Sequence, residues 1–171
     1  MSALIDSVRL LLHPEWSRGG GPAGIRAGKV TAGGSEPIVI FLLGVRINRW
    51  RMVRRWLPLL LTVAGAVREL AEDRNSGLLG YRLLLGPGPR QAMIVQYWRG
   101  HDDLRRFARG ERHRSAQRRY WWHYGASDGV GVWHELIGSP SGQHHAMYGN
   151  MPPTGLGALR DVRSEEWSAA R

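Results

Sequence analysis

The sequence predicts an α+β domain of the ferredoxin-like kind: one antiparallel sheet with two helical regions on one face. Two observations predict this fold class. Between residues 38 and 137, apolar and amphipathic stretches follow in the order strand, helix, strand, strand, helix, strand, and that order places both helical regions on the same side of the sheet. The strands are also too apolar for a face to be left in water. We therefore expect the face without helices to be covered by a partner, a ligand or both.

The first helical segment is predicted at Trp50–Asp73, directly after the strand Ile38–Asn48. Pro58 lies inside this segment, and we expect a kink or a restart there because proline lacks a backbone N–H. Gly77 follows as a left-handed helix cap. The residues expected to face the sheet recur at i, i+3/i+4 spacing: Val53, Leu57, Leu60, Ala64, Val67 and Ala71.

The two middle strands are predicted at Leu78–Leu85 and Ala92–Arg99. The GPGPRQ sequence between them is typical of a turn, so they should form a hairpin. A second helical region starts near residue 100 and is expected to break at Gly110. The fourth strand is predicted at Val130–Ile137.

The chain is expected to hold one principal domain. Its 171 residues are too few for two ordinary domains. Residues 1–24 are read as a flexible N-terminal extension because glycine and proline follow a short amphipathic segment. Residues 25–157 then form the domain, with a C-terminal tail packed on it, and residues 158–171 form a frayed end.

Several classes of protein are excluded by composition. The chain has no cysteine, so disulfides, thiolate zinc sites, thiol nucleophiles and iron–sulfur clusters are ruled out. The longest apolar stretch, residues 56–67, is far shorter than the roughly 20 residues of a membrane span. No signal peptide is recognisable at the N-terminus. We expect a cytoplasmic protein without a membrane partner.

The net charge of +10 suggests nucleic acid or anionic lipid as a partner at first sight. However, Lys29 is the only lysine, and such a preference for arginine resembles the codon bias of a GC-rich genome. The segment RRFARGERHRSAQRRYWWHY interleaves arginines with aromatic residues, as single-strand binders do. No RNA-module motif accompanies it, so a helix with a solvated basic face is the better interpretation. No nucleic-acid partner is predicted.

Three polar residues in the predicted strands are candidate catalytic groups. Arg46 and Asn48 share one face of the first strand, where a guanidinium and an amide could hold a substrate enolate or carboxylate. The alternative for Arg46 is an ion pair at the sheet edge or a dimer seam. His134 lies in the middle of the apolar fourth strand and could remove a phenol or β-diketone proton. The alternative for His134 is a histidine that is simply hydrogen-bonded in the core. Glu135 should point to the opposite face.

An aromatic-rich set is predicted to hold a flat, hydrophobic substrate, since such walls suit aromatic ligands. The alternative is ordinary core and dimer packing. The predicted substrate-binding residues are Tyr97, Trp98, Trp122, Trp133 and Tyr148.

No metal site is predicted, because the histidines show neither HExxH nor carboxylate–histidine spacing. Haem with one axial histidine leaves no such spacing, and His123 or His134 would be the ligand. No phosphate-binding loop follows a strand, so nucleotide binding is not expected.

The motifs FLLGVRINRW, RRWLP, SGLLGYRLLLG, VQYWR, WHE and YGNMPP, in that order, resemble a bacterial family. This family is grouped with the fungal monooxygenase-like protein of the fumagillin pathway, within the antibiotic-biosynthesis-monooxygenase type of dimeric α/β barrel. The resemblance covers roughly residues 26 to 157. It implies that two ferredoxin-like protomers place their bare sheet faces together and enclose pockets.

The resemblance also implies a class of chemistry. Some proteins of this type oxygenate electron-rich aromatic or polyketide substrates without a metal or flavin, others bind haem, and others only bind or isomerise small molecules. The leading hypothesis is thus a homodimeric, monooxygenase-like enzyme that needs no cofactor and acts on an aromatic or polyketide-like molecule. The alternative is a non-catalytic homodimer that binds a small molecule or haem.

Overall fold

The computed structural model describes residues 26–86, 88–124, 128–159 and 162–165. Within these, four strands form the main sheet: β2 (Ile38–Ile47), β3 (Leu78–Leu85), β4 (Gln91–Trp98) and β5 (Val130–Ser139). Their order across the sheet is β3-β4-β2-β5, and every neighbouring pair is antiparallel. The ferredoxin-like prediction is confirmed.

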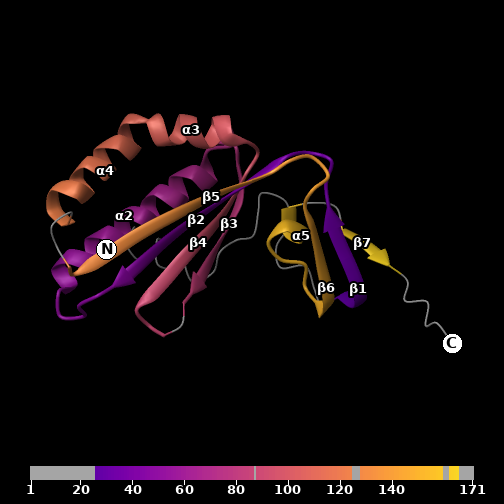
Figure 1. The fold of residues 1–171 in the computed structure, drawn as a ribbon, viewed down its shortest axis with the longest axis horizontal. Helices are drawn as coiled ribbons and strands as arrows, with labels where there is room; N and C mark the ends of the chain where they lie inside the picture. Colours follow the sequence, from indigo (N-terminus) through magenta and orange to yellow (C-terminus); the bar gives the residue numbers. More distant parts are fainter. Residues whose placement is uncertain (1–25, 87, 125–127, 160–161, 166–171) are drawn as a thin grey trace.

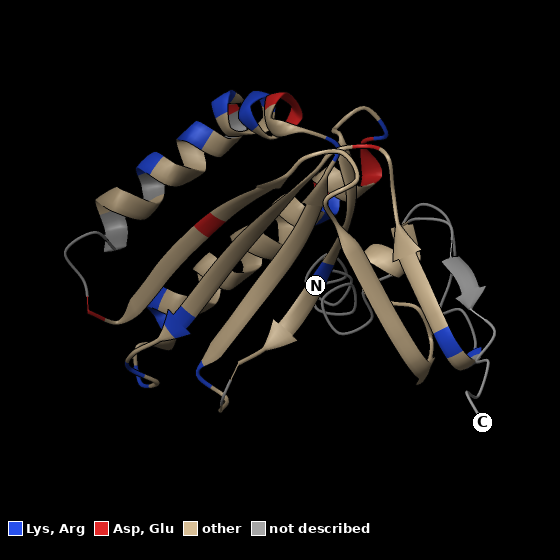
Figure 2. Ribbon diagram, turned by 45° about the vertical axis from the view of Figure 1, so that its right-hand side comes forward, with Lys and Arg blue, Asp and Glu red and all other residues tan. Residues whose placement is uncertain are grey.

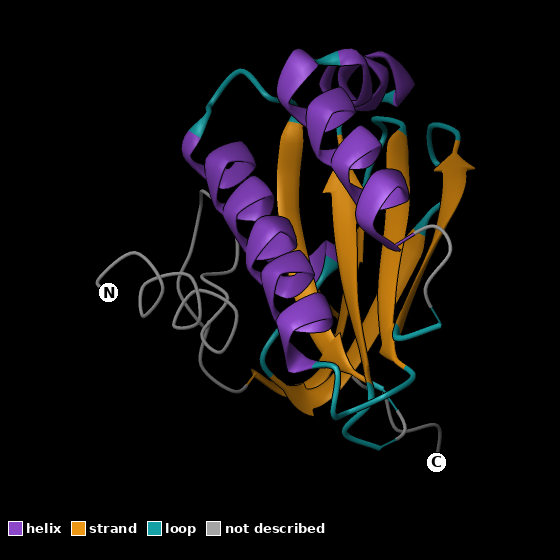
Figure 3. Ribbon diagram, turned by 90° about the vertical axis from the view of Figure 1, so that its left-hand side faces the viewer, coloured by secondary structure: helices purple, strands orange, loops and turns teal. Residues whose placement is uncertain are grey.

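Three helices lie on one face of this sheet (Figure 3): α2 (Val53–Glu72), α3 (His101–Arg109) and α4 (Glu111–Tyr124). Because side chains alternate along a strand, the odd-numbered residues of β2 face the helices and the even-numbered ones face away. Val39 and Trp98 pack there against Val67 and Leu70 of α2. The helix face is therefore the main hydrophobic core. As predicted, the helical region breaks at Gly110, between α3 and α4.

Helix α2 is continuous through Pro58, so no restart occurs. At the N-terminal end of α2, the residues that face the sheet are not the predicted ones. Val53 is 43% exposed and Leu57 is 41% exposed, whereas Leu59 is buried against Val45. The apolar residues on both sides of Pro58 allow two overlapping stripes, and docking on β2 selects the one that contains Leu59. Ala64 and Val67 are buried as expected.

A second, smaller sheet was not predicted. It has the order β6-β1-β7 and consists of β1 (Arg26–Gly33), β6 (His145–Met151) and β7 (Val162–Glu165). Residues 34–37 link β1 to β2, and residues 140–144 link β5 to β6. Since β1 pairs with β6 and β2 pairs with β5, the same two chain segments run from one sheet into the other (Figure 1).

The C-terminal end of the chain differs from its predicted character where it is described. Residues 162–165, expected in a frayed end, form β7 and pair with β1, because β1 offers it a free edge. The short helix α5 (Leu156–Leu159) precedes β7. The predicted extension, residues 1–24, lies outside the described residues.

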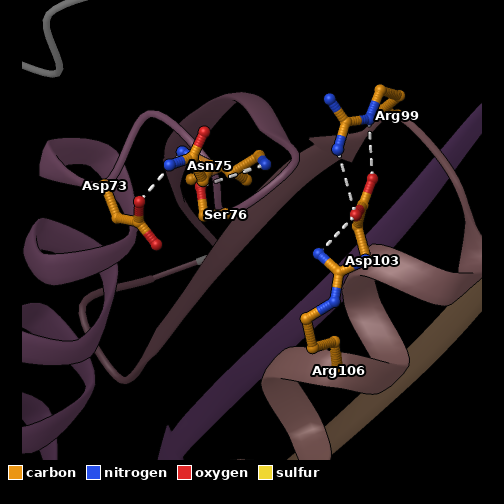
Figure 4. Close-up of polar contacts among 7 residues, drawn as sticks. Asp73, Asn75, Ser76, Arg99, Asp103 and Arg106 are labelled. Carbon is orange, nitrogen blue, oxygen red and sulfur yellow. Dashed lines mark hydrogen bonds and ion pairs between the residues drawn. The ribbon is translucent and has the colours of Figure 1, made fainter.

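The start of α3 is fixed by an ionic cluster (Figure 4). Asp103 is buried, and its carboxylate accepts hydrogen bonds from Arg99 at 2.8 and 3.1 Å and from Arg106 at 2.8 Å. The positive end of the helix dipole also stabilises a carboxylate in the first helical turn. Gly77, with φ +81°, lies against Asp103, and a Cβ atom at Gly77 would come within 2.4 Å of that side chain. This cluster holds the turn after α2 next to the start of α3.

Candidate active site

The candidate site lies where α4 crosses the helix-facing side of β5; we call this region the α4–β5 seam. The register of β5 places His134 opposite Leu43, and Leu136 opposite Phe41. His134 shares its face with Val130 and Val132, which belong to the core packed against the helices. Tyr120 of α4 hydrogen-bonds the backbone of Val132 and ties α4 to β5. His134 therefore lies beside the helical layer, two residues from that tie.

Aromatic rings line the seam. The Phe41 ring is 5.6 Å from the His134 imidazole, and the Phe107 ring is 4.8 Å from the imidazole of His113 on α4. Phe107 in turn contacts Trp98, with 5.8 Å between the ring centres. Ring pairs at these separations are mutually favourable. The two histidines thus sit at the open end of a ring cluster that continues into the core.

The seam sets the charge of His113. Burial lowers the pKa of His113 below its ordinary value of 6.5, and the nearby His134 lowers it further. Burial disfavours the charged imidazole, and a second histidine opposes it when charged. His113 is consequently neutral at pH 7 and able to accept a proton or a hydrogen bond. The seam thus offers a neutral base in an aromatic setting.

The structure does not bring the three predicted catalytic residues together. Arg46 pairs with Gln91 and Gly131 and points to the sheet face away from the helices, whereas His134 points toward the helices. Arg46 and Asn48 are both exposed at the end of β2. The Asn48 backbone N–H donates to the carbonyl of Gly129 at 3.0 Å. Glu135 is opposite Leu42, on the face that His134 does not use.

The predicted substrate-binding residues are also divided. Trp98 is fully buried in the core, where its indole N–H donates to the Gln96 side chain at 3.0 Å. Trp122 is 87% exposed on α4. Tyr97 and Trp133 lie on the helix-free face of the main sheet, opposite Ile40 and Gly44 respectively.

That helix-free face is covered at one end by the chain itself. A Cβ atom at Gly80 would meet the Leu159 side chain of α5 at 2.7 Å, and one at Gly155 would meet the Tyr97 hydroxyl at 2.7 Å. Burial raises the pKa of Tyr97, which the Arg82 cation partly offsets. Tyr148, the last of the predicted set, helps to hold α5. Its hydroxyl accepts from the Gly157 N–H at 2.8 Å and donates to the Thr154 carbonyl at 2.5 Å.

His113 and Phe41 are the seam residues that the sequence reasoning missed. In the sequence, Phe41 is one of many apolar residues in the predicted strand. His113 stands among arginines in the sequence. The one signal that it faces the sheet is its helical spacing to Ala116 and Tyr120, which also face inward.

A family model described as monooxygenase af470-like matches residues 38–156. The chain belongs to this family. None of the curated proteins compared with the sequence matches it significantly. The match spans the main sheet, all three of its helices and β6, so the family match includes both sides of the α4–β5 seam.

Two solved structures are similar to this chain. An aldoxime dehydratase, OxdRE, in complex with butyraldoxime is 17% identical with a TM-score of 0.59, over 84% of this chain and 40% of that one. SnoaB, a cofactor-independent oxygenase from Streptomyces nogalater, is 15% identical in a mutant form, with a TM-score of 0.41, over 58% of this chain and 90% of that one. At 17% identity the likeness to OxdRE concerns the fold alone.

The described residues contain no group of three or more histidine and acidic side chains arranged to hold a metal ion. No described helix is long and apolar enough to cross a membrane.

Proposed function

We propose that this monooxygenase-like protein oxidises a hydrophobic aromatic or polyketide-like small molecule at the α4–β5 seam. The observation that carries the proposal is the pair His113 and His134, set among the rings of Phe41 and Phe107. Flat apolar molecules stack on such rings, and a neutral imidazole is the group best suited to take a proton near pH 7.

In this proposal a histidine of the seam removes a proton from an acidic C–H or O–H of the bound substrate. His134 is the better placed base because it is exposed and can reach a ligand. The resulting anion reacts with dioxygen. One oxygen atom enters the substrate, as when a ring CH₂ becomes C=O, and the other leaves as water with the two substrate hydrogens. The substrate itself supplies the electrons, so no cofactor is required.

Arg46 and Asn48 stay candidates for binding an anionic part of a ligand, but at a different place. Both lie at the C-terminal end of β2, where Arg46 points to the helix-free face of the main sheet. An exposed guanidinium there suits the carboxylate of a ligand or of a partner. We do not assign these two residues to the proton transfer at His134.

A homodimer is part of the proposal. Trp133 is 40% exposed and Ile137 is 48% exposed on the helix-free face. Leu42 and Met93 lie on the same face. Exposed apolar patches of this kind mark contact surfaces. A second copy of the chain, placed face to face, would bury them.

The test is oxygen uptake by the purified protein with an anthrone or a naphthohydroquinone. We expect His134→Ala to lower the turnover by roughly 10²–10⁴-fold, the usual contribution of a general base. His145→Ala is the matched control, because His145 is an exposed strand histidine in the other sheet. Equal turnover in wild type and His134→Ala would overturn the proposed role.

The second candidate function is haem or small-molecule binding without catalysis. The exposed imidazole of His134, next to the Phe41 ring, is a donor of the type that binds haem iron. Bound haem would be held by His134 and would supply redox chemistry at the seam. The visible spectrum of the protein with added haemin distinguishes the two candidates. A Soret band that is lost in His134→Ala favours haem binding.

A further inference from the structure

The outer face of α4 carries two tryptophans that the fold does not bury. Trp121 is 61% exposed and Trp122 is 87% exposed. Together with Gln117 and Arg118 they line a shallow hollow on the surface. Tryptophan seldom stays this exposed without a partner, because its ring buries a large apolar area. By helical spacing Trp122 lies on the side of α4 away from Tyr120, whereas Trp121 lies at the flank, where its ring is 5.3 Å from the Tyr120 ring.

The same region is strongly basic. Residues 101–124 contain seven arginines and three acidic residues, which leaves a charge of +4 (seven minus three). One of the three carboxylates, Asp103, is already paired with Arg99 and Arg106. Figure 2 shows the basic positions recurring along α3 and α4. Arg118 and Arg114 are exposed one and two turns before the tryptophans, respectively.

We propose that this Trp121–Trp122 face of α4 docks the protein on an anionic lipid surface. Tryptophan rings favour the boundary between lipid headgroups and acyl chains, and arginines are attracted to anionic headgroups. An amphipathic helix with both features lies in the plane of the interface and does not cross it. This differs from the expectation drawn from the sequence, which discounts anionic lipid because the charge is almost all arginine; the exposed tryptophans beside that charge are what the structure adds.

Docking here has a consequence for the seam. The inner face of α4 forms one wall of the seam through His113 and Tyr120. Its outer face would then rest on the lipid in which a hydrophobic molecule accumulates. The docking proposal does not depend on oxygenation, and lipid binding is measured without a substrate.

The experiment is co-sedimentation of the full chain with vesicles. The probes are vesicles of phosphatidylglycerol and phosphatidylcholine in equal parts, and vesicles of phosphatidylcholine alone. We expect binding to the anionic vesicles that weakens steeply between 50 and 500 mM salt, because the attraction is screened. We expect about tenfold weaker binding for the Trp121→Ala/Trp122→Ala double variant, and a similar loss for Arg118→Glu.

Arg90→Glu is the matched control, since Arg90 is an exposed arginine in the β3–β4 turn with the same change of charge. It should bind nearly as well as wild type. The proposal would be overturned by no binding of wild type to anionic vesicles, equal binding to neutral ones, equal losses in Arg118→Glu and Arg90→Glu, or wild-type binding by the double variant. A dimer that dissociates in the double variant during sedimentation would instead assign this face to a second copy. Tight binding to single-stranded RNA with none to vesicles would assign it to nucleic acid.

Discussion

Gly44 and Trp133 are cross-strand partners, and the Trp133 indole lies over the Gly44 backbone. A Cβ atom at Gly44 would lie 2.1 Å from the indole nitrogen. The glycine thus allows a large ring to lie flat on the helix-free face, where it presents apolar surface. This contact joins the two strands that also carry Phe41 and His134 on the other face.

Gly44→Ala should destabilise the fold, because the added methyl group displaces the Trp133 ring. We expect a loss of about 1–3 kcal/mol in the free energy of unfolding, measured by urea denaturation. Gly131→Ala is the control: it is a strand glycine on the same face, and the nearest atom to its added Cβ is 3.8 Å away. A loss no larger for Gly44→Ala than for Gly131→Ala would contradict the contact.

Asp103→Asn should lower stability near neutral pH by roughly 2 kcal/mol, because it weakens charge-assisted hydrogen bonds around a buried group. The Arg99 guanidinium holds the pKa of Asp103 below its ordinary value of 3.8, and Arg106 adds to this effect. The stability that Asp103 contributes is therefore present above that ordinary value. It is lost as the pH falls through the lower pKa of the folded state.

The difference between wild type and Asp103→Asn should consequently shrink as the pH is lowered from 5 toward 3. Asp102→Asn is the control, since the Asp102 side chain is 93% exposed and its pair with Arg105 is a surface pair. A difference that stays constant across this range would argue against a charged Asp103 in the folded protein.

The titration of His113 is predicted to occur below pH 6.5, and proton NMR of its imidazole measures this directly. Burial is the main cause and the nearby His134 the second. In His134→Ala the pKa of His113 should therefore rise slightly and still stay below 6.5. The fold favours the neutral form, so the stability linked to His113 is present above 6.5 and declines as the pH falls toward the folded pKa. A titration at or above 6.5 would mean that the His113 ring is not buried in the seam.

Tyr148→Phe should loosen α5 by removing the hydroxyl that joins Gly157 to Thr154. We expect a loss of about 1–2 kcal/mol, because the Gly157 N–H is left buried without its acceptor. Hydrogen exchange at the Gly157 amide should become faster. For Tyr97→Phe, which removes no hydrogen bond among the described residues, the exchange at Gly157 should stay as in wild type.

The order of the main elements could be predicted from the sequence because turn residues delimit the apolar runs. The predicted strand Leu78–Leu85 coincides with β3, and Gly77 has the left-handed conformation expected of it. Side-chain alternation also predicts which residues of the same strand share a face with Arg46 and with His134. Alternation separates the odd-numbered from the even-numbered residues of β5. It does not tell which of the two sets faces the helices, because that depends on how β5 pairs with β2.

The small sheet could not be predicted for a related reason. The segment of β1, RAGKVTAG, has too few apolar residues to stand out from the glycine-rich sequence around it. It is a strand because β6 and β7 pair with both of its edges, and these pairs join residues far apart in the chain. The position of His113 in the seam likewise follows from how α4 docks on β5, which is a tertiary contact.

The measurement that tests the central claim most directly is a crystal structure of the protein with a bound anthrone. The account predicts the ligand in the α4–β5 seam, stacked near Phe41 and within hydrogen-bonding distance of the His134 imidazole. A ligand held on the helix-free face, beside Tyr97 and Trp133 and away from His134, would contradict it.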